Sequence, residues 1–163
     1  MFATAIVACS GDSAEALLHQ IDDAQSRIDM LREDVDAHAA AASAAADLAA
    51  LQRAEGSHHD LVRRHMDDLG HIITDMGECD GVPDDRVDSM MDGHDSCGAE
   101  LERHRDAIAG ATAVDAARGE EQHHRTEMMD CLDELDDMMD TMMSDHGMAM
   151  CRGHHGMDDH ERS

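Results

Sequence analysis

The stretch LLHQIDDAQSRIDMLREDV, residues 17–35, carries apolar side chains at intervals of three and four residues. Side chains at these intervals lie on one face of an α-helix. The residues between them are mostly charged or polar, so the apolar face is a narrow seam, which is typical of a helix in a bundle. The positions that form this seam are Leu17, Ile21, Ala24, Ile28, Leu31 and Val35.

Three further segments carry the same spacing, and turn-forming stretches separate them. These stretches are AEGSHHD (54–60), CDGVPDD (79–85) and AGATAVD (109–115), which contain glycine, proline or helix-capping residues. Short connections make successive helices antiparallel, so the sequence predicts an all-α, up-down-up-down four-helix bundle over residues 10–145. We expect its helices at about 12–54, 57–79, 84–110 and 112–145.

The composition limits which partners the protein can bind. The chain has 38 acidic and 12 basic residues, and its formal net charge is −26. Such a surface repels nucleic acid and attracts cations. Phe2 is the sole aromatic residue among Phe, Tyr and Trp, whereas pockets for organic substrates are usually lined by aromatic and apolar side chains. We therefore expect a binding protein for metal ions and not an enzyme.

The predicted seam contains polar side chains where a bundle core ordinarily has Leu or Ile. A buried imidazole without a partner costs about 1–3 kcal/mol, so several of them indicate a ligand. Thiolate and thioether donors favour Cu(I), and imidazole also binds copper. We expect Cu(I) ions along the bundle axis. The predicted interior ligands are His38, His58, His65, Met76, Cys79, Met90, Met91, His94, Cys97, His104, His124, Met128, Cys131, Met138 and Met142.

Methionine and histidine are also concentrated near the C-terminus, in MMDTMMSDHGMAMCRGHHGM (138–157). Three glycines in this stretch predict that regular structure ends there. We expect residues 146–163 to form a flexible tail with a second set of soft ligands. The predicted tail ligands are His146, Met148, Met150, Cys151, His154, His155 and Met157.

The chain begins with MFATAIVAC (residues 1–9), an apolar run that ends in cysteine. The segment IVAC resembles the lipobox of bacterial lipoproteins, although no basic residue precedes it. The resemblance implies that residues 1–9 are a signal remnant and that Cys9 carries a lipid, which is the only membrane attachment. It also implies a location in the cell envelope, on the periplasmic or extracellular face.

The predicted ligands carry two further resemblances. The inward-facing set resembles that of bacterial copper-storage four-helix bundles, although those are lined chiefly by cysteine in CxxxC spacing. The stretch 138–160 resembles the Met-rich segments of periplasmic copper-resistance proteins. Together these resemblances imply an extracytoplasmic copper(I)-binding protein for storage, buffering or resistance. The oligomeric state stays open.

Several alternatives remain at this point. His65, Cys97 and His124 would also form a reasonable zinc site, and a purely structural helical lipoprotein would account for the seam and the charge. The cysteines could instead form disulfides, with Cys97 joined to Cys131 or Cys79 joined to Cys151.

Glu-x-x-His is the spacing used by carboxylate-bridged di-iron bundles. That site also needs inward glutamates on the other two helices, and the predicted first helix offers only alanine at that level. Glu55 lies beside the predicted turn, so we do not favour the di-iron site. The pattern occurs at Glu55/His58, Glu120/His123 and Glu121/His124.

Overall fold

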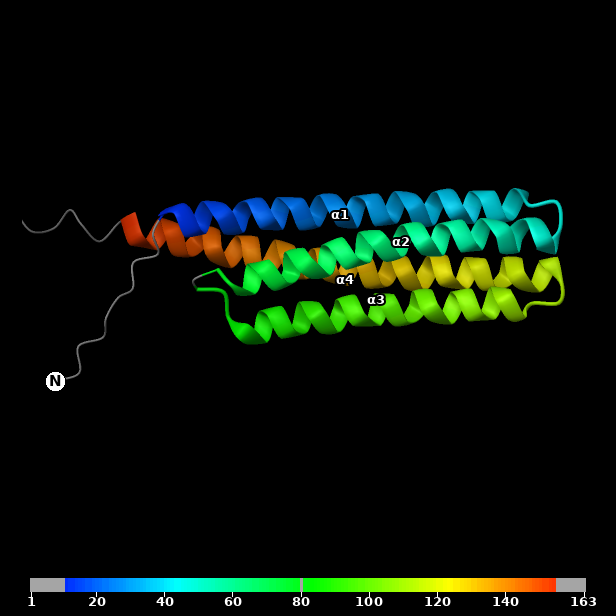
Figure 1. The fold of residues 1–163 in the computed structure, drawn as a ribbon. Helices are drawn as coiled ribbons and strands as arrows, with labels where there is room; N and C mark the ends of the chain where they lie inside the picture. The colour runs from blue at the N-terminus through cyan, green and yellow to red at the C-terminus, as the bar shows by residue number, and fades with distance from the viewer. Residues whose placement is uncertain (1–10, 80, 155–163) are drawn as a thin grey trace, which may run out of the picture.

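The computed structural model describes residues 11–79 and 81–154, with side chains for residues 15–79 and 81–144. Over these residues the chain forms four helices, each antiparallel to the one before it and packed against the two beside it (Figure 1). The predicted four-helix bundle is therefore confirmed. None of the described helices combines the length and hydropathy needed to cross a membrane. The helices are α1 (Gly11–Ala44), α2 (Leu48–Gly77), α3 (Asp84–Gly110) and α4 (Val114–His154).

The first turn lies earlier than the sequence predicted. It falls between Ala44 and Leu48, so the predicted break at 54–60 is wrong and Gly56 lies inside α2. Asp47 caps α2, since its carboxylate accepts a hydrogen bond of 2.8 Å from the amide of Ala50. Alanine surrounds this turn, and its high helix propensity makes the turn hard to recognise in the sequence. The earlier turn changes which residues of the first two helices lie level.

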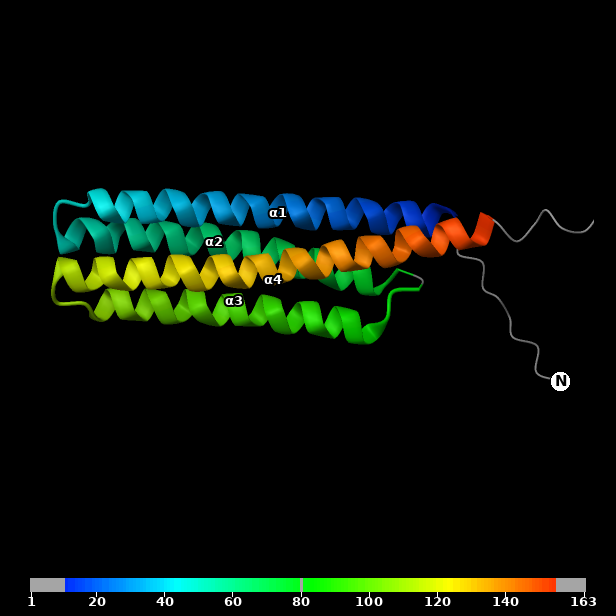
Figure 2. The same cartoon turned by 180° about the vertical axis from the view of Figure 1, so that it is seen from behind.

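The other two turns lie where they were predicted. Gly81 has a φ of 93° in the connection before α3, a conformation that glycine adopts without strain. The third turn follows Gly110. The last helix continues to His154, past the expected helix end at 145, and Figure 2 shows it reaching beyond the α2–α3 turn.

The apolar seams form two cores, which polar residues separate. The small core lies beside the α1–α2 and α3–α4 turns and consists of Ala42, Leu51, Ile108 and Ala117. The large core fills the rest of the bundle toward the α2–α3 turn, and burying each of its large side chains contributes roughly 1.5–3 kcal/mol. Its members include Leu17, Ile21, Ile28, Leu31, Val35, Val62, Leu69, Ile73, Leu101 and Leu135.

A disulfide links the third and fourth helices. It joins Cys97 to Cys131, whose Cα atoms are 5.8 Å apart. This is one of the two pairings that the sequence left open. A crosslink across a sequence separation of 34 residues stabilises a fold by roughly 3–4 kcal/mol in the chain-entropy picture.

Candidate metal centre

Four buried polar side chains, one from each helix, meet between the two cores. They are His38 on α1, Glu55 on α2, His104 on α3 and Glu121 on α4, and none is more than 5% exposed. One donor atom from each residue lies within 4.8 Å of the other three donor atoms. We call these four residues the inner ring.

Imidazole and carboxylate groups alternate around the inner ring. The Nε2 atom of His38 is 2.9 Å from Glu55 Oε2 and 3.0 Å from Glu121 Oε2. The Nε2 atom of His104 is 3.1 Å and 3.2 Å from the same two oxygens. Of these four contacts, only that between His104 and Glu55 has the alignment of a hydrogen bond. The four ligand atoms therefore lie close together, but only one pair of them is hydrogen-bonded.

Two further histidines lie against the inner ring. The ring of His58 stacks on that of His38, with centroids 4.0 Å apart, and the ring of His124 stacks on that of His104 at 3.9 Å. His58 is 6% exposed and His124 has no exposed surface. We call this pair the stacked histidines, and the inner ring together with them the chamber.

Acidic side chains contact the chamber from the α3–α4 side. The Nδ1–H of His124 donates to Glu100 Oε1 at 3.2 Å, and Glu120 Oε1 lies 4.0 Å from Nδ1 of His104. Arg103 holds both glutamates in place through contacts of 2.6 Å and 2.5 Å. A carboxylate behind an imidazole is the usual outer support of a metal-binding histidine, because it fixes the tautomer and the ring orientation.

The inner ring is charged but nearly neutral as a whole. Burial alone would lower the pKa of His38 and His104, but the adjoining carboxylates outweigh burial and raise both pKa values to about 9. Burial would likewise raise the pKa of Glu55 and Glu121, yet the two adjoining imidazolium groups lower both. In the metal-free protein, two positive and two negative groups therefore balance at neutral pH.

The stacked histidines are neutral under the same conditions. Burial, followed by the charge on His38, lowers the pKa of His58 to about 3. Burial and the charge on His104 lower the pKa of His124 to about 4. Neutral imidazole is the form that binds metal ions.

The chamber repeats within the chain. Its three residues on α1 and α2 recur on α3 and α4 at a constant offset of 66 positions (104 minus 38, 121 minus 55, 124 minus 58). The same offset relates the ends of α1 and α3 and the starts of α2 and α4. Two similar helical hairpins thus face each other across the chamber. The equivalent pairs are His38/His104, Glu55/Glu121 and His58/His124.

The structure brings together only part of the predicted ligand set. His38, His58, His104 and His124 were predicted and do meet. Glu55 and Glu121 were not predicted as ligands, because a turn was expected beside Glu55 and alanine was expected on the first helix at the level of Glu121. A comparison of the sequence with itself at an offset of 66 would have revealed both glutamates. The two sequence-based grounds against a di-iron site are wrong, because His38 and not alanine lies at this level of α1 and Glu55 lies inside α2. The di-iron pattern nevertheless differs from this chain, since it has glutamate at the positions of His38 and His104.

The predicted sulfur ligands lie elsewhere and contact other groups. Cys97 and Cys131 are joined to each other, and Cys79 donates a hydrogen bond to Gln20 Oε1 at 3.1 Å. The predicted methionines that the large core buries or contacts are Met76, Met90, Met91, Met128, Met138 and Met142.

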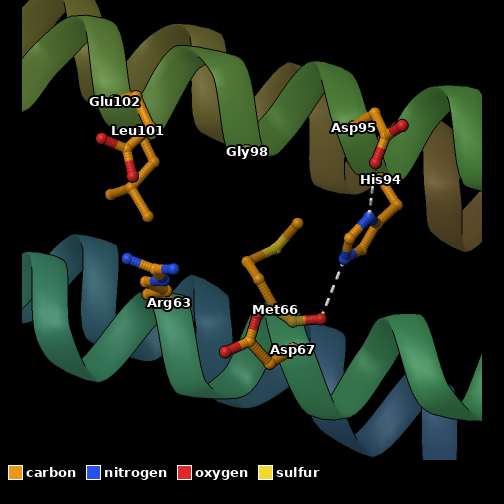
Figure 3. A pocket seen from close by; sticks show the side chains of 8 residues that line it. All are labelled: Arg63, Met66, Asp67, His94, Asp95, Gly98, Leu101 and Glu102. Atoms are coloured by element: carbon orange, nitrogen blue, oxygen red, sulfur yellow. Dashed lines mark hydrogen bonds and ion pairs between the residues drawn. The ribbon is translucent and has the colours of Figure 1, made fainter.

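Two predicted histidines also lie outside the chamber. His65 contacts Arg27 at 2.8 Å and Asp34 at 3.4 Å. Figure 3 shows His94 in a pocket between α2 and α3, where its Nε2–H donates to the backbone oxygen of Met66 at 2.9 Å and its Nδ1 lies 3.2 Å from Asp95. Both nitrogens of His94 are therefore engaged away from the inner ring.

The remaining predicted residues lie outside the described side chains. These are the lipidation site Cys9 and the tail ligands His146, Met148, Met150, Cys151, His154, His155 and Met157. Their predicted roles stay predictions.

No protein-family model, curated protein or solved structure matches this chain. Two imidazoles and two carboxylates around one point are a donor set that can hold a metal ion.

Proposed function

We propose that this protein binds a divalent transition-metal ion at the inner ring, and that Zn²⁺ and Cu²⁺ fit it best. The observation that carries the proposal is the convergence of four buried donor atoms, one from each helix, within 4.8 Å. Imidazole suits zinc, copper, iron and nickel, and carboxylate is a common partner ligand. Among divalent ions, copper and zinc bind such nitrogen and oxygen sites most strongly.

Charge also favours a divalent ion. Glu55 and Glu121 supply two negative charges from side chains that are only 3% exposed. A divalent ion that binds here displaces the protons of His38 and His104 to solvent. The ion, two neutral imidazoles and two carboxylates then have no net charge, which lowers the cost of burying the ion. A single Cu(I) ion in the same ring would leave one negative charge uncompensated. The inner ring therefore supports a divalent ion over Cu(I).

We further propose a binding role in an extracytoplasmic compartment. The chamber residues are at most 6% exposed, so an organic substrate would not reach the ion without separating the helices. The Cys97–Cys131 disulfide supports an oxidising compartment, where such bonds persist. Copper storage, buffering or resistance and a lipid anchor stay predictions from the sequence.

The test is a metal titration of the full-length, oxidised protein after treatment with a chelator. We expect Zn²⁺ and Cu²⁺ to compete with a coloured chelator and to raise the melting temperature. The free energy of unfolding should rise by about 2.7 kcal/mol when the free metal ion is at a hundredfold excess over Kd. Glu55→Gln/Glu121→Gln keeps the side-chain shape and should weaken the tightest site by more than about 100-fold, since it removes two ligands.

A control variant makes the result specific. His71→Gln/His123→Gln removes exposed histidines from α2 and α4 and should bind as the wild type does. If Glu55→Gln/Glu121→Gln bound the metal ion as tightly as the wild type, the proposal would be contradicted.

The same assay tests the predicted Cu(I) column. Cys97→Ala/Cys131→Ala removes two of its ligands but none from the inner ring. We expect unchanged binding of Zn²⁺ and Cu²⁺ by this variant. A large loss of Cu(I) sites, measured anaerobically after reduction, would instead support the column.

A further inference from the structure

The chamber contains more unpartnered ligand atoms than one metal ion can use. His58 Nε2, His124 Nε2, Glu55 Oε1 and Glu121 Oε1 are all buried, and none has a hydrogen-bond partner among the described residues. Buried polar atoms in proteins are paired in the large majority of cases. These four atoms belong to one chamber, in which the rings of His58 and His124 have centroids 5.7 Å apart. They therefore need an explanation, and the four inner-ring contacts do not use them.

We infer that these four atoms form a second metal position beside the inner ring, so that the chamber holds two divalent ions bridged by both carboxylates. The inference rests on the proposed function, because the first ion uses the other oxygen of each glutamate. Each ion then has two imidazoles and one oxygen from each glutamate. Imidazole and carboxylate ligands favour divalent transition-metal ions of intermediate hardness, such as Zn²⁺, Co²⁺ or Fe²⁺.

The spacing of the histidine rings fits two ions. The stacked pairs have centroids 4.0 Å and 3.9 Å apart and are within 4° and 9° of parallel. If the Nε2 atoms of two such rings point the same way, ions bound to them lie about one stacking distance apart. Two-metal sites in proteins hold their ions about 3.5–4 Å apart. The stacking distance therefore matches a bridged pair.

The hydrogen bond behind His124 supports its role as a ligand. A carboxylate oxygen only accepts, so the hydrogen bond to Glu100 uses an Nδ1–H of His124 and leaves Nε2 as the ring nitrogen that can bind a metal ion. Nε2 then carries a lone pair, and this is the buried atom without a partner. A carboxylate that orients the other nitrogen is the usual support of a metal-bound imidazole.

The second ion should bind more weakly than the first. The two bridging carboxylates are shared, so two divalent ions leave an excess of positive charge in the chamber. Glu100 and Glu120 lie behind the rings of His124 and His104 and offset part of it, although Arg103 contacts both. We therefore expect stepwise loading.

The test counts Co²⁺ bound to the full-length protein, by elemental analysis after gel filtration. The number of ions bound by Glu55→Gln/Glu121→Gln represents binding outside the chamber, and it is subtracted from the number bound by each other protein. The wild type should then hold two ions and His58→Leu/His124→Leu one. His71→Gln/His123→Gln should match the wild type. His58→Gln/His124→Gln, which keeps a polar side chain, covers the case in which leucine disturbs folding.

Electron paramagnetic resonance supplies a readout that does not depend on variants. Two bridged Co²⁺ ions should couple magnetically in the fully loaded wild type, whereas isolated ions should not. A subtracted count of one for both the wild type and the His58/His124 variants, without coupling, would overturn the second position and leave the proposed function standing. A subtracted count of zero for the wild type would overturn both.

Discussion

The neighbours of each chamber histidine decide whether its ring carries a proton. His38 and His104 lie between two carboxylates, which hold their protons on. His58 and His124 lie one stacking distance away, and burial together with those protonated rings keeps them neutral. The pKa values of similar imidazoles in one buried site are therefore shifted in opposite directions from the ordinary value of 6.5. This opposition should be visible in the stability of the metal-free protein.

We expect the melting temperature of the chelator-treated protein to pass through a maximum near pH 6.5. The raised pKa of His38 and His104 stabilises the fold fully below pH 6.5, and this contribution is lost as the pH rises through about 9. The lowered pKa of His58 and His124 does not affect stability above pH 6.5. Stability falls as the pH drops from 6.5 toward about 4 and 3, because the imidazoles of the unfolded chain bind protons that the buried ones do not. Thermal melts between pH 4.5 and 10 measure the fall in melting temperature below the maximum, the acid limb, and above it, the alkaline limb.

A matched pair of variants assigns the acid limb. His58→Leu/His124→Leu should flatten the profile between pH 6.5 and 4.5 and leave the alkaline limb in place. The exposed pair His71→Gln/His123→Gln should leave both limbs unchanged. An acid limb of equal slope in all three proteins would contradict the burial of neutral imidazoles.

At the level of the helices, sequence periodicity predicted the fold but misplaced one turn. Apolar residues at intervals of three and four define the seams, and the turns before α3 and α4 carry proline or glycine. The α1–α2 turn has alanine on both sides, and the cap Asp47 is its main local signal. Periodicity does not fix the relative height of two helices, so this single error placed Glu55 beside a turn. The four chamber histidines were predictable as interior residues, but their meeting with two glutamates depends on the correct turn.

Gly56→Ala tests the position of this turn. Gly56 lies within α2, and a Cβ atom there would meet nothing within 4 Å. Alanine should therefore raise the free energy of unfolding by about 0.5–1 kcal/mol, because glycine loses more backbone entropy in a helix. Urea denaturation measures the change. Gly70→Ala is the control and should gain less, since its Cβ would lie 3.1 Å from His94 Nε2.

A loss of stability in Gly56→Ala would mean that Gly56 ends a helix in a left-handed conformation. That outcome would contradict the continuous helix from Leu48 to Gly77 and the meeting of Glu55 with His38.

Across the whole molecule, the chamber interrupts an otherwise continuous apolar interior. Two equivalent hairpins, related by the offset of 66 residues, each contribute His, Glu and His at the same height. The small core lies on one side of the chamber and the large core on the other. Both hairpins must come together before any inner-ring donor has its full set of neighbours. A metal ion bound there would therefore link the hairpins directly.

The cost of the chamber to the metal-free bundle can be measured by filling it. Replacing its four histidines by Leu and its two glutamates by Met joins the two cores with side chains of similar size. Exchanging buried charged groups for well-packed apolar ones is often neutral or stabilising by about 1–4 kcal/mol. We therefore expect the six-residue variant to unfold at equal or higher urea concentration than the metal-free wild type, and Zn²⁺ should no longer stabilise it. The wild type with saturating Zn²⁺ should recover part or all of the difference, because the ion satisfies the buried donors.

If the filled variant is folded but clearly less stable than the metal-free wild type, the ion pairs of the inner ring stabilise the bundle by themselves. The chamber would then be explained as a structural network without a metal ion.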